Sequence, residues 1–326
     1  MNTNSTNSKA NSISSTTKLL TITGPTACGK TSLAAELAYQ LGGEIISADS
    51  RQVFRGMDIG SGKDLADYHI HDTDIPYHLI DIHDAGYEYN VYQFMNDFIC
   101  AFHDIVGRGR QPILCGGTGM YIESVVKGYQ LADAPVDPEF RRRMEAYTDQ
   151  ELTARLAGYI KLHNHTDTET RDRLLRALEI QEYRLQHPDA YPHMPPMQHL
   201  VVGVSFPRAQ VIERIGIRLR QRLEGGMIEE VKNLLDSGVP EERLLRYGLE
   251  YRHVTQYLRG QCSYDDMYRD LYTDIRRFAK RQMTWFRRME RQGIPIHWID
   301  GTLSLDDKVE AILSLFRQPD AEREQS

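Results

Sequence analysis

The sequence predicts an α/β fold in which a parallel β-sheet is flanked by helices and interrupted by a helical insertion. Short apolar runs rich in β-formers alternate with helical patterns as far as Gly119, which is typical of a parallel sheet. The strand signal disappears between Ala132 and Gln198 and returns at Leu200. These observations indicate a sheet domain with a second, helical domain inserted into it.

The N-terminal part begins with a β–α–β unit and continues the same alternation. The first run is short and consists of Leu, Thr and Ile, as a buried strand requires, and a Gly-rich turn joins it to a helical pattern. The expected strands are Leu19–Thr23, Glu44–Ala48 and Pro112–Cys115, and the expected helices are Ser32–Leu41, Val91–Val106 and a segment after Gly119.

The C-terminal part is mainly helical. A strand at Leu200–Ser205 precedes long helices within Pro207–Arg291, a last strand at Ile294–Ile299 and a C-terminal helix. The stretch 132–198 is basic in its middle and ends in a Pro- and His-rich segment, the composition of an insertion. We therefore expect a disordered tail at 1–17, a core domain of 18–131 with 199–316, an insertion at 132–198, and a frayed tail at 317–326.

Composition excludes several classes of protein. The 326 residues are 40% hydrophobic and 26% charged, which is typical of a globular chain. No apolar run approaches the roughly 18 residues that a membrane span needs, and the N-terminal tail has no hydrophobic signal core. The four cysteines are far apart, so neither a zinc site nor a disulfide framework is indicated. We expect a cytoplasmic monomer with no membrane partner.

The charge is unevenly distributed. A formal net charge of −7 argues against a nucleic-acid partner, because neutralising phosphates drives such binding. One segment reverses this balance, with seven basic residues against a single acid, Glu290. The basic residues are Arg276, Arg277, Lys280, Arg281, Arg287, Arg288 and Arg291. This segment is either a solvated helix face or a surface for an anionic polymer.

A phosphate-binding loop stands between the first strand and the first helix. Its residues fit the pattern GxxxxGK[ST] and are Gly24, Pro25, Thr26, Ala27, Cys28, Gly29, Lys30 and Thr31. Glycines let backbone amides converge on phosphate oxygens at the positive end of the helix. Lys30 supplies a point charge, and Thr31 can hold a magnesium ion (Mg²⁺). The loop indicates a di- or triphosphate ligand, and the fold class becomes a P-loop NTPase-like sheet.

Two further segments follow strand ends and are expected at the same crevice, because ligands of open α/β sheets bind at the carboxyl ends of the strands. Asp49 closes the second strand, where its carboxylate either accepts a proton or caps a turn. The turn Gly116–Gly119 follows Cys115, so its amides and the Thr118 hydroxyl are expected to reach the crevice.

Taken in order, the motifs resemble those of one family, the tRNA dimethylallyltransferases (isopentenyl-tRNA transferases). The resemblance covers nearly all of Leu19–Asp300. The segments that carry it are Gly24–Thr31, Asp49–Gly60, His78–Ile82, Gly116–Tyr121, Arg176–Glu179 and Ala279–Arg287. The last of these, AKRQMTW followed by Phe286 and Arg287, is the most specific.

The resemblance implies an activity: transfer of a dimethylallyl group from dimethylallyl pyrophosphate to the exocyclic amine of the adenine immediately 3′ of the anticodon. In such enzymes the loop binds the donor's pyrophosphate rather than ATP, with Mg²⁺, and the counterpart of Asp49 is the base. Thr118 is the other expected catalytic residue beside Asp49. Lys30, Thr31, Arg214 and Arg218 are the candidates for neutralising the leaving group. The two arginines lie four residues apart on one helix face, and the sequence does not rank them.

The family pattern also points to the residues that contact the tRNA anticodon stem-loop. They are Asp49, Ser50, Arg51, Gln52, Thr118, Arg141, Asp172, Arg173, Leu174, Leu175, Arg176, Lys280, Arg281, Gln282, Met283, Thr284, Trp285, Phe286 and Arg287. Lys and Arg hold an RNA backbone, and aromatic side chains stack on splayed bases. Trp285 has a second interpretation, as a core residue of its helix. The insertion 132–198 resembles the family's anticodon-loop clamp.

Four positions depart from the family pattern. Cys28 replaces a usual Ser in a loop position that contributes mainly its backbone amide, and Phe54 stands where Tyr is usual. Glu250 falls where Gly is common, and Arg222 falls where Met is common. The last two put the geometry of the RNA groove and of the helix carrying Arg214 in question.

Three other functions compete with this interpretation. A P-loop small-molecule kinase would use Asp49 to activate an acceptor hydroxyl, but it leaves the basic segment and the insertion unexplained. An adenylate isopentenyltransferase would act on free nucleotide, and the insertion with Lys280–Arg287 favours tRNA instead. A non-catalytic RNA-binding protein would not need Lys30, Thr31, Asp49 and Thr118 together.

Overall fold

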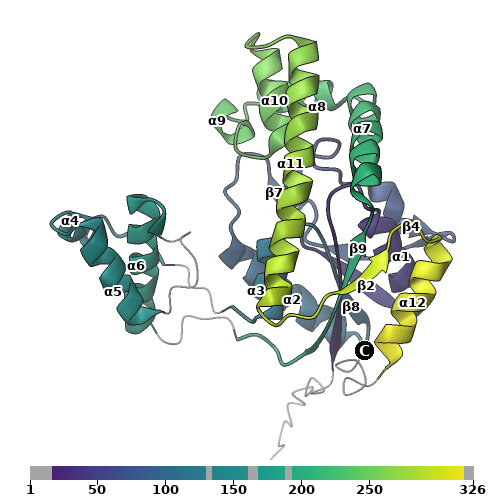
Figure 1. Ribbon diagram of the computed structural model, residues 1–326, viewed down its shortest axis with the longest axis horizontal. Coiled ribbons are helices and arrows are strands. Elements are labelled where there is room, and N and C mark those ends of the chain that lie inside the picture. The colour runs from purple at the N-terminus through teal and green to yellow at the C-terminus, as the bar shows by residue number, and fades with distance from the viewer. Residues whose placement is uncertain (1–16, 130–133, 161–167, 188–192, 319–326) are drawn as a thin grey trace, which may run out of the picture. The chain divides into compact units, whose positions relative to one another are not determined.

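A six-stranded parallel sheet forms the centre of the molecule, in the order β10–β9–β1–β8–β2–β6 (Figure 1). The computed structural model describes residues 17–129, 134–160, 168–187 and 193–318. The sheet strands are β1 (Lys18–Thr23), β2 (Gly43–Ser47), β6 (Tyr77–His78), β8 (Gln111–Cys115), β9 (Gln198–Ser205) and β10 (His297–Asp300). The predicted parallel sheet flanked by helices is confirmed.

The strand register brings three loops to one edge of the sheet. Ile22 of β1 lies opposite Cys115 of β8, and Cys115 lies opposite Ser47 of β2. Because the strands are parallel, the segments that follow them all leave from the carboxyl edge. The phosphate-binding loop, the turn after Cys115 and the segment after Ser47 therefore start side by side.

Helices cover both faces of the sheet (Figure 1). On one face, α1 (Lys30–Leu41) and α12 (Leu305–Arg317) pack against each other and against strand side chains. On the other, α2 (Val91–Gly107) packs on β2, β8 and α3 (Gly119–Val126). Asn90 begins α2 with a capping box, and Phe94, Phe98 and Phe102, at four-residue spacing, form its buried stripe.

A group of helices extends beyond the carboxyl edge of the sheet. It contains α7 (Arg208–Glu224), α8 (Met227–Asp236), α9 (Glu241–Leu244), α10 (Leu249–Leu258) and the long α11 (Tyr264–Arg291). Met267, Leu271, Ile275 and Ala279 recur every four residues along α11 and are buried in one apolar cluster with residues of α7, α8 and α10. This packing holds the basic segment of α11 close to the sheet edge.

The segment between β2 and α2 contains short elements that the sequence did not predict. They are β3 (Phe54–Arg55), a 3₁₀ helix at Leu65–Tyr68, β4 (His69–Ile70), β5 (Thr73–Asp74), β6 and β7 (His83–Asp84). Two-residue strands have no periodicity to detect. The last predicted strand also began too early, because β10 starts at His297, after Pro295, which has no N–H to donate to a ladder.

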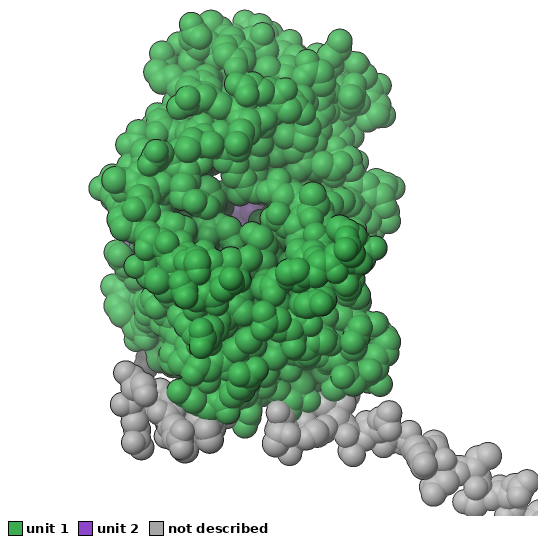
Figure 2. Space-filling model, turned by 90° about the vertical axis from the view of Figure 1, so that its right-hand side faces the viewer, with its two compact units in different colours: residues 1–127, 195–326 green, residues 128–194 purple. Residues whose placement is uncertain are grey.

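The chain divides into two units: unit 1, residues 1–127 with 195–326, and unit 2, residues 128–194 (green and purple in Figure 2). Unit 2 contains α4 (Pro138–Met144), α5 (Asp149–Tyr159) and α6 (Arg171–Gln186), packed around six buried side chains. These are Phe140, Met144, Leu152, Leu156, Leu174 and Leu178. The predicted insertion, 132–198, therefore begins and ends four residues later in the sequence than unit 2 does.

Parts of the predicted organisation fall outside the described residues. The N-terminal tail other than Thr17, and the C-terminal tail from 319 onward, belong to these parts, as does 188–192 within the Pro- and His-rich segment. Within the described ranges, no helix has the length and apolar character needed to cross a membrane.

Candidate active site

The phosphate-binding loop joins β1 to α1 in a conformation that depends on glycine. Gly24 and Gly29 have φ angles of 145° and 77°, and a Cβ on Gly24 would lie 2.6 Å from the Val204 carbonyl oxygen. The first turn of α1 has no acidic residue and no side-chain cap. Its free N–H groups and the helix dipole therefore favour an anion at this position.

Lys30 and Thr31 begin α1 and line two cavities. The main pocket, about 450 Å³, is lined by Asp49, Lys30 and Thr31 among other residues. The outer cavity, about 310 Å³, is also lined by Lys30 and Thr31, together with Arg214 and Arg218. The Lys30 ammonium donates to the Pro25 carbonyl at 3.0 Å and lies 3.7 Å from the Cys28 sulfur. It thus lies against its own loop, where it can turn to a bound phosphate.

Asp49 lies in the segment that follows β2, and its position is fixed by the backbone. One of its carboxylate oxygens accepts from the Arg51 amide at 3.0 Å. The amide of Ala48 donates to Cys115 at 2.7 Å, and the Ser50 amide donates to the Thr118 hydroxyl at 3.1 Å. Asp49 lines the main pocket with Lys30 and Thr31. The structure therefore brings the predicted base and the predicted phosphate site into one cavity.

Thr118 and the glycines before it tie two strand ends together. The Thr118 amide donates to the Ala48 carbonyl at 3.1 Å, and its hydroxyl accepts from Ser50. A Cβ on Gly116 would lie 2.2 Å from the Ala48 carbonyl oxygen, so only glycine allows this approach. Thr118 lines the main pocket, yet its hydrogen bonds position the Asp49 segment.

Arg214 and Arg218 both lie beside the loop, in different ways. The Arg214 guanidinium donates to the Ala27 carbonyl at 2.8 Å and stacks on the Phe206 ring at 4.7 Å. Arg218 pairs with Asp64 and lines both cavities, whereas Arg214 lines only the outer one. Arg218 is therefore the better placed of the two for a group that reaches from the loop toward Asp49.

Gln282 connects α11 to both phosphate-side turns. Its amide nitrogen donates to the Gly117 carbonyl at 2.8 Å, and its oxygen accepts from the Thr26 amide at 2.9 Å. The side chain is buried. The sequence predicted a tRNA contact here, but the hydrogen bonds make Gln282 a brace within the protein.

The predicted tRNA contacts on α11 are divided between two cavities rather than gathered on one surface. Arg281 and Trp285 line the main pocket. Four other predicted tRNA contacts, Lys280, Met283, Thr284 and Arg287, line a groove of about 570 Å³ that also contains α7 residues and Pro25. We call this the α7–α11 groove. The helical period separates neighbours in sequence by about 100°, so a contiguous motif divides between two faces.

Two of the predicted tRNA contacts have side chains that are buried in the protein. Phe286 is 0% exposed and packs edge-on against Trp298, and Leu174 is 1% exposed in the core of unit 2. Trp285, for which a core position was the alternative, is half-buried and lines the main pocket. The Arg288 guanidinium stacks on its ring at 4.0 Å.

In unit 2, the predicted contacts Arg141 and Arg176 bind protein groups. Arg141 donates to Glu179 at 2.7 Å and to Asp172 at 2.7 Å, while Arg176 donates to the Ala134 carbonyl at 2.6 Å. Glu179 is buried, so these arginines compensate a desolvated carboxylate. Arg173 is exposed, and Leu175 is half-buried.

Burial shapes the electrostatics of the main pocket. Burial lowers the pKa of Arg51, although the nearby Asp49 carboxylate opposes that effect. Burial also raises the pKa of the Cys115 thiol to about 12, which keeps this pocket-lining sulfur protonated and neutral. A thiolate nucleophile at Cys115 is thereby excluded at neutral pH.

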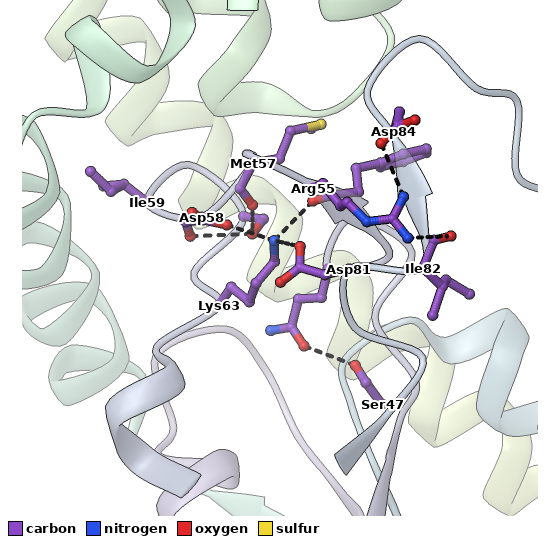
Figure 3. A network of polar contacts seen from close by, with 12 residues as sticks. Ser47, Arg55, Met57, Asp58, Ile59, Lys63, Asp81, Ile82 and Asp84 are labelled. Carbon is purple, nitrogen blue, oxygen red and sulfur yellow. Dashed lines mark hydrogen bonds and ion pairs between the residues drawn. The ribbon is translucent and has the colours of Figure 1, made fainter. Parts of the chain in front are cut away.

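Sequence reasoning missed a buried lysine, Lys63, whose polar contacts are drawn in Figure 3 and which directly follows the pocket-lining residues 60–62. The Lys63 side chain is fully buried, and its ammonium donates to the Phe54 carbonyl at 2.8 Å, to Asp58 at 2.6 Å and to Asp81 at 2.5 Å. Glu230 of α8 fixes the same loop by accepting from three consecutive amides, 58 to 60. In the sequence, this role was indicated only by the presence of a lysine between Asp49–Gly60 and His78–Ile82, two segments that resemble the family.

Family models match most of the chain. The family described as IPP transferase matches residues 52–289, and the one described as isopentenyl transferase matches residues 17–75. The two ranges together include the phosphate-binding loop, Asp49 and α11 as far as Met289.

Curated and solved relatives agree with these matches. The chain is 54% identical over 298 residues to tRNA dimethylallyltransferase 1 of Porphyromonas gingivalis, covering 91% of this chain and 99% of the relative. It is 52% identical over 297 residues to tRNA dimethylallyltransferase 2 of Phocaeicola vulgatus, covering 91% and 97%. The crystal structure of the tRNA isopentenylpyrophosphate transferase of Bacillus halodurans superposes with a TM-score of 0.68 at 33% identity, covering 92% and 95%.

Proposed function

The chain belongs to the IPP transferase family, with tRNA dimethylallyltransferases as its curated relatives, and from this premise we propose a specific reaction for its main pocket. The dimethylallyl group passes from dimethylallyl pyrophosphate to the exocyclic amine of the adenine immediately 3′ of the anticodon in tRNA. Pyrophosphate is released. Because tRNA is the acceptor, we assign the reaction to the cytoplasm.

One observation carries the proposal: the phosphate-binding loop and Asp49 line the same pocket, together with Arg281 and Trp285 of α11. A diphosphate ester held by the loop and an amine beside Asp49 would lie next to each other there. Holding two reactants in such a geometry is itself a large part of catalysis.

At the donor end, charge must be neutralised as the bond from the allylic carbon to the pyrophosphate oxygen breaks. The loop amides, Lys30 and Arg218 are positioned for this, and Arg214 supports the loop from the outer cavity. Arg218 would exchange its partner Asp64 for the leaving group.

Thr31 fits a Mg²⁺ ion accompanying the pyrophosphate. Its hydroxyl lies at the start of α1 and lines both cavities. Among the described residues, no group of three or more His, Cys, Asp or Glu is placed to hold a metal. Mg²⁺ bound mainly by phosphate oxygens and water needs only one or two protein ligands. When bound, the ion supplies positive charge to the leaving group.

At the acceptor end, Asp49 takes a proton from the adenine amine. The amine nitrogen forms a bond to the allylic carbon while the carbon–oxygen bond to pyrophosphate breaks. The nitrogen becomes acidic as the new bond forms, so its proton passes to the carboxylate. Thr118 and the Arg51 amide hold this segment in position for the transfer.

The surroundings of the pocket suit an RNA acceptor. Trp285 lines the pocket as an aromatic residue with Arg288 stacked on its ring, and Arg281 offers an exposed charge. Aromatic stacking and phosphate contacts are how proteins hold a base splayed from a single-stranded loop. We propose that unit 2 contributes contacts to the anticodon stem-loop through exposed residues such as Arg173.

Four parallel incubations of the purified chain separate this function from its rivals. Two reactions contain labelled dimethylallyl pyrophosphate as the donor, one with unmodified tRNA and one with AMP as the acceptor. In the other two reactions, ATP replaces dimethylallyl pyrophosphate and the acceptors are the same. The proposal expects label in tRNA only. Label in AMP identifies an adenylate isopentenyltransferase, and phosphate transfer from ATP identifies a kinase. Binding of tRNA without transfer indicates an RNA-binding protein.

A further inference from the structure

Two positions at which the sequence departs from the family pattern meet in the wall of the main pocket. Arg222 of α7 donates to Glu250 of α10 at 3.4 Å, although 28 residues separate them in the chain. Their side chains are 13% and 19% exposed, and both line the pocket. An arginine at position 222 without a carboxylate at position 250, or the reverse, would leave an unpaired charge buried. The two side chains together are electrically neutral.

Glu250 also lies beside a second arginine, Arg51. A Cβ built on Gly248 would be 3.7 Å from the Arg51 Nε and 4.0 Å from a Glu250 carboxylate oxygen, so the two side chains flank one glycine. Arg51 donates to the Arg246 carbonyl at 3.1 Å, and its amide holds Asp49. Glu250 therefore lies close to both Arg222 and Arg51, the arginine two residues after the proposed base Asp49.

Arg222, in turn, supports the donor side. A Cβ on Gly62 would lie 1.7 Å from the Arg222 Nη2, so the guanidinium packs directly on this glycine. The Gly62 carbonyl accepts from Gln52 at 3.2 Å and from Arg218 at 3.5 Å. Arg222 thus touches the backbone that connects the Asp49 segment to Arg218.

Arg222 is poorly compensated apart from Glu250. Its Nε is buried and has no hydrogen-bond partner in the described part of the chain. Burial lowers its pKa and the neighbouring Arg218 lowers it further, while Glu250 and Asp64 oppose both effects. A desolvated guanidinium with one adjacent carboxylate depends on that carboxylate to keep its place.

We propose that Arg222 and Glu250 act as a positioning pair that holds Arg51 at the acceptor end of the pocket and Arg218 at the donor end. Glu250 neutralises Arg222 and is shared with Arg51, and Arg222 holds Gly62 against Arg218. The inference rests on the proposed function, which assigns Arg218 to the pyrophosphate, and on the family pattern, which places Arg51 among the residues that contact the tRNA.

Breaking the pair from each side should disturb a different substrate. Without Arg222, the Glu250 carboxylate pairs with the nearby Arg51 and draws it away from the acceptor end. Without the Glu250 charge, Arg222 is repelled by Arg218 and competes for Asp64 or for the pyrophosphate. Removing both charges abolishes both effects, because a neutral pair leaves no buried charge unpaired.

A double-mutant cycle tests this with Arg222→Met, Glu250→Gln and the double variant, measuring kcat and the KM of each substrate. We expect Arg222→Met to raise the tRNA KM and Glu250→Gln to change the donor KM, each by about tenfold, a typical coupling between contacting residues. The double variant should recover most of both changes. Arg222→Lys, which keeps the charge and is less prone to unfold, should retain the tRNA KM.

Arg108→Met is the matched control, because Arg108 pairs with the buried Glu44 at 2.6 Å and does not line the main pocket. It should lower the melting temperature and leave both KM values in place. Additive effects in the cycle, or singles that change both KM values equally, would overturn the positioning pair while wild-type transfer upholds the proposed function. If the wild-type protein transfers no prenyl group, both proposals fail.

Discussion

Asp49 is positioned mainly by hydrogen bonds of its own segment. The Arg51 amide donates to its carboxylate, and the amides on either side of it bind Cys115 and Thr118. The side chain therefore faces a pocket that also contains the phosphate-binding loop. A carboxylate in this position can serve as a base without being consumed by an ion pair.

Asp49→Asn should lower kcat by about 10²- to 10⁴-fold, because it keeps the hydrogen bond and the volume but cannot take a proton. The Michaelis constants should change far less, since the proton is lost only as the new bond forms. Steady-state kinetics with both substrates varied measures this. Normal turnover, or a failure limited to donor binding, would make Asp49 a structural cap or a metal ligand.

Lys30→Ala and Thr31→Ala should abolish most prenyl transfer while tRNA still binds. Both residues start α1 beside the loop, and neither belongs to the α7–α11 groove. Ser32→Ala is the matched control, because Ser32 is the next residue on the same helix and donates only weakly, at 3.4 Å, to Gly29. Gel-shift affinity that falls in parallel with activity would count against the assignment.

For individual residues, the sequence predicted the chemical role of a side chain better than its exposure to solvent. The loop and Asp49 could be placed because strand ends and glycine patterns restrict where they lie. The burial of Phe286 and Leu174 could not be predicted, because the residue types in a motif do not show which side of a helix faces the core. Gln282 shows the same limit, since its two hydrogen bonds to distant turns exist only in the folded chain.

At the scale of elements, α11 divides its basic residues between the main pocket and the α7–α11 groove. The sequence predicted the basic segment but treated it as one surface. The assembly of α7, α10 and α11 around a shared apolar cluster decides which residues face which cavity. Such packing between distant segments is not contained in local periodicity.

Neutralising Lys280 and Arg281 together should raise the tRNA KM and flatten its dependence on salt, because each lost phosphate contact reduces the slope by about one. The two single variants should each account for part of the change, since Arg281 lines the main pocket and Lys280 lines the α7–α11 groove. Arg269→Ala is the control, as Arg269 is exposed on the same helix and pairs with Asp266 and Asp270. Salt slopes equal to wild type would make the segment a solvated face.

Within unit 2, Glu179 should make stability depend on pH. Its burial would raise its pKa, but the hydrogen bonds from Arg141 and Arg176 outweigh this and hold the pKa below the usual 4.5. The resulting stability is fully present above pH 4.5 and is lost as pH falls through the lowered pKa. The melting-temperature difference between wild type and Glu179→Gln should shrink in acid. A constant difference would exclude the linkage.

For the whole molecule, the sequence predicted a parallel sheet flanked by helices, because alternating strand and helix patterns leave few topologies open. It predicted a helical insertion because the strand signal stops and restarts. It did not predict the short strands between β2 and α2, nor the wall that Lys63 and Glu230 stabilise, because those depend on contacts between distant segments.

If this pocket joins a prenyl donor to one adenine of tRNA, the transferred group must be found on that base. Unmodified tRNA and labelled dimethylallyl pyrophosphate are incubated with the protein, and the tRNA is digested and mapped by mass spectrometry. We expect the label on the exocyclic nitrogen of the adenine immediately 3′ of the anticodon, with one pyrophosphate released per group transferred. Label at another nucleotide, or none in tRNA, would contradict it.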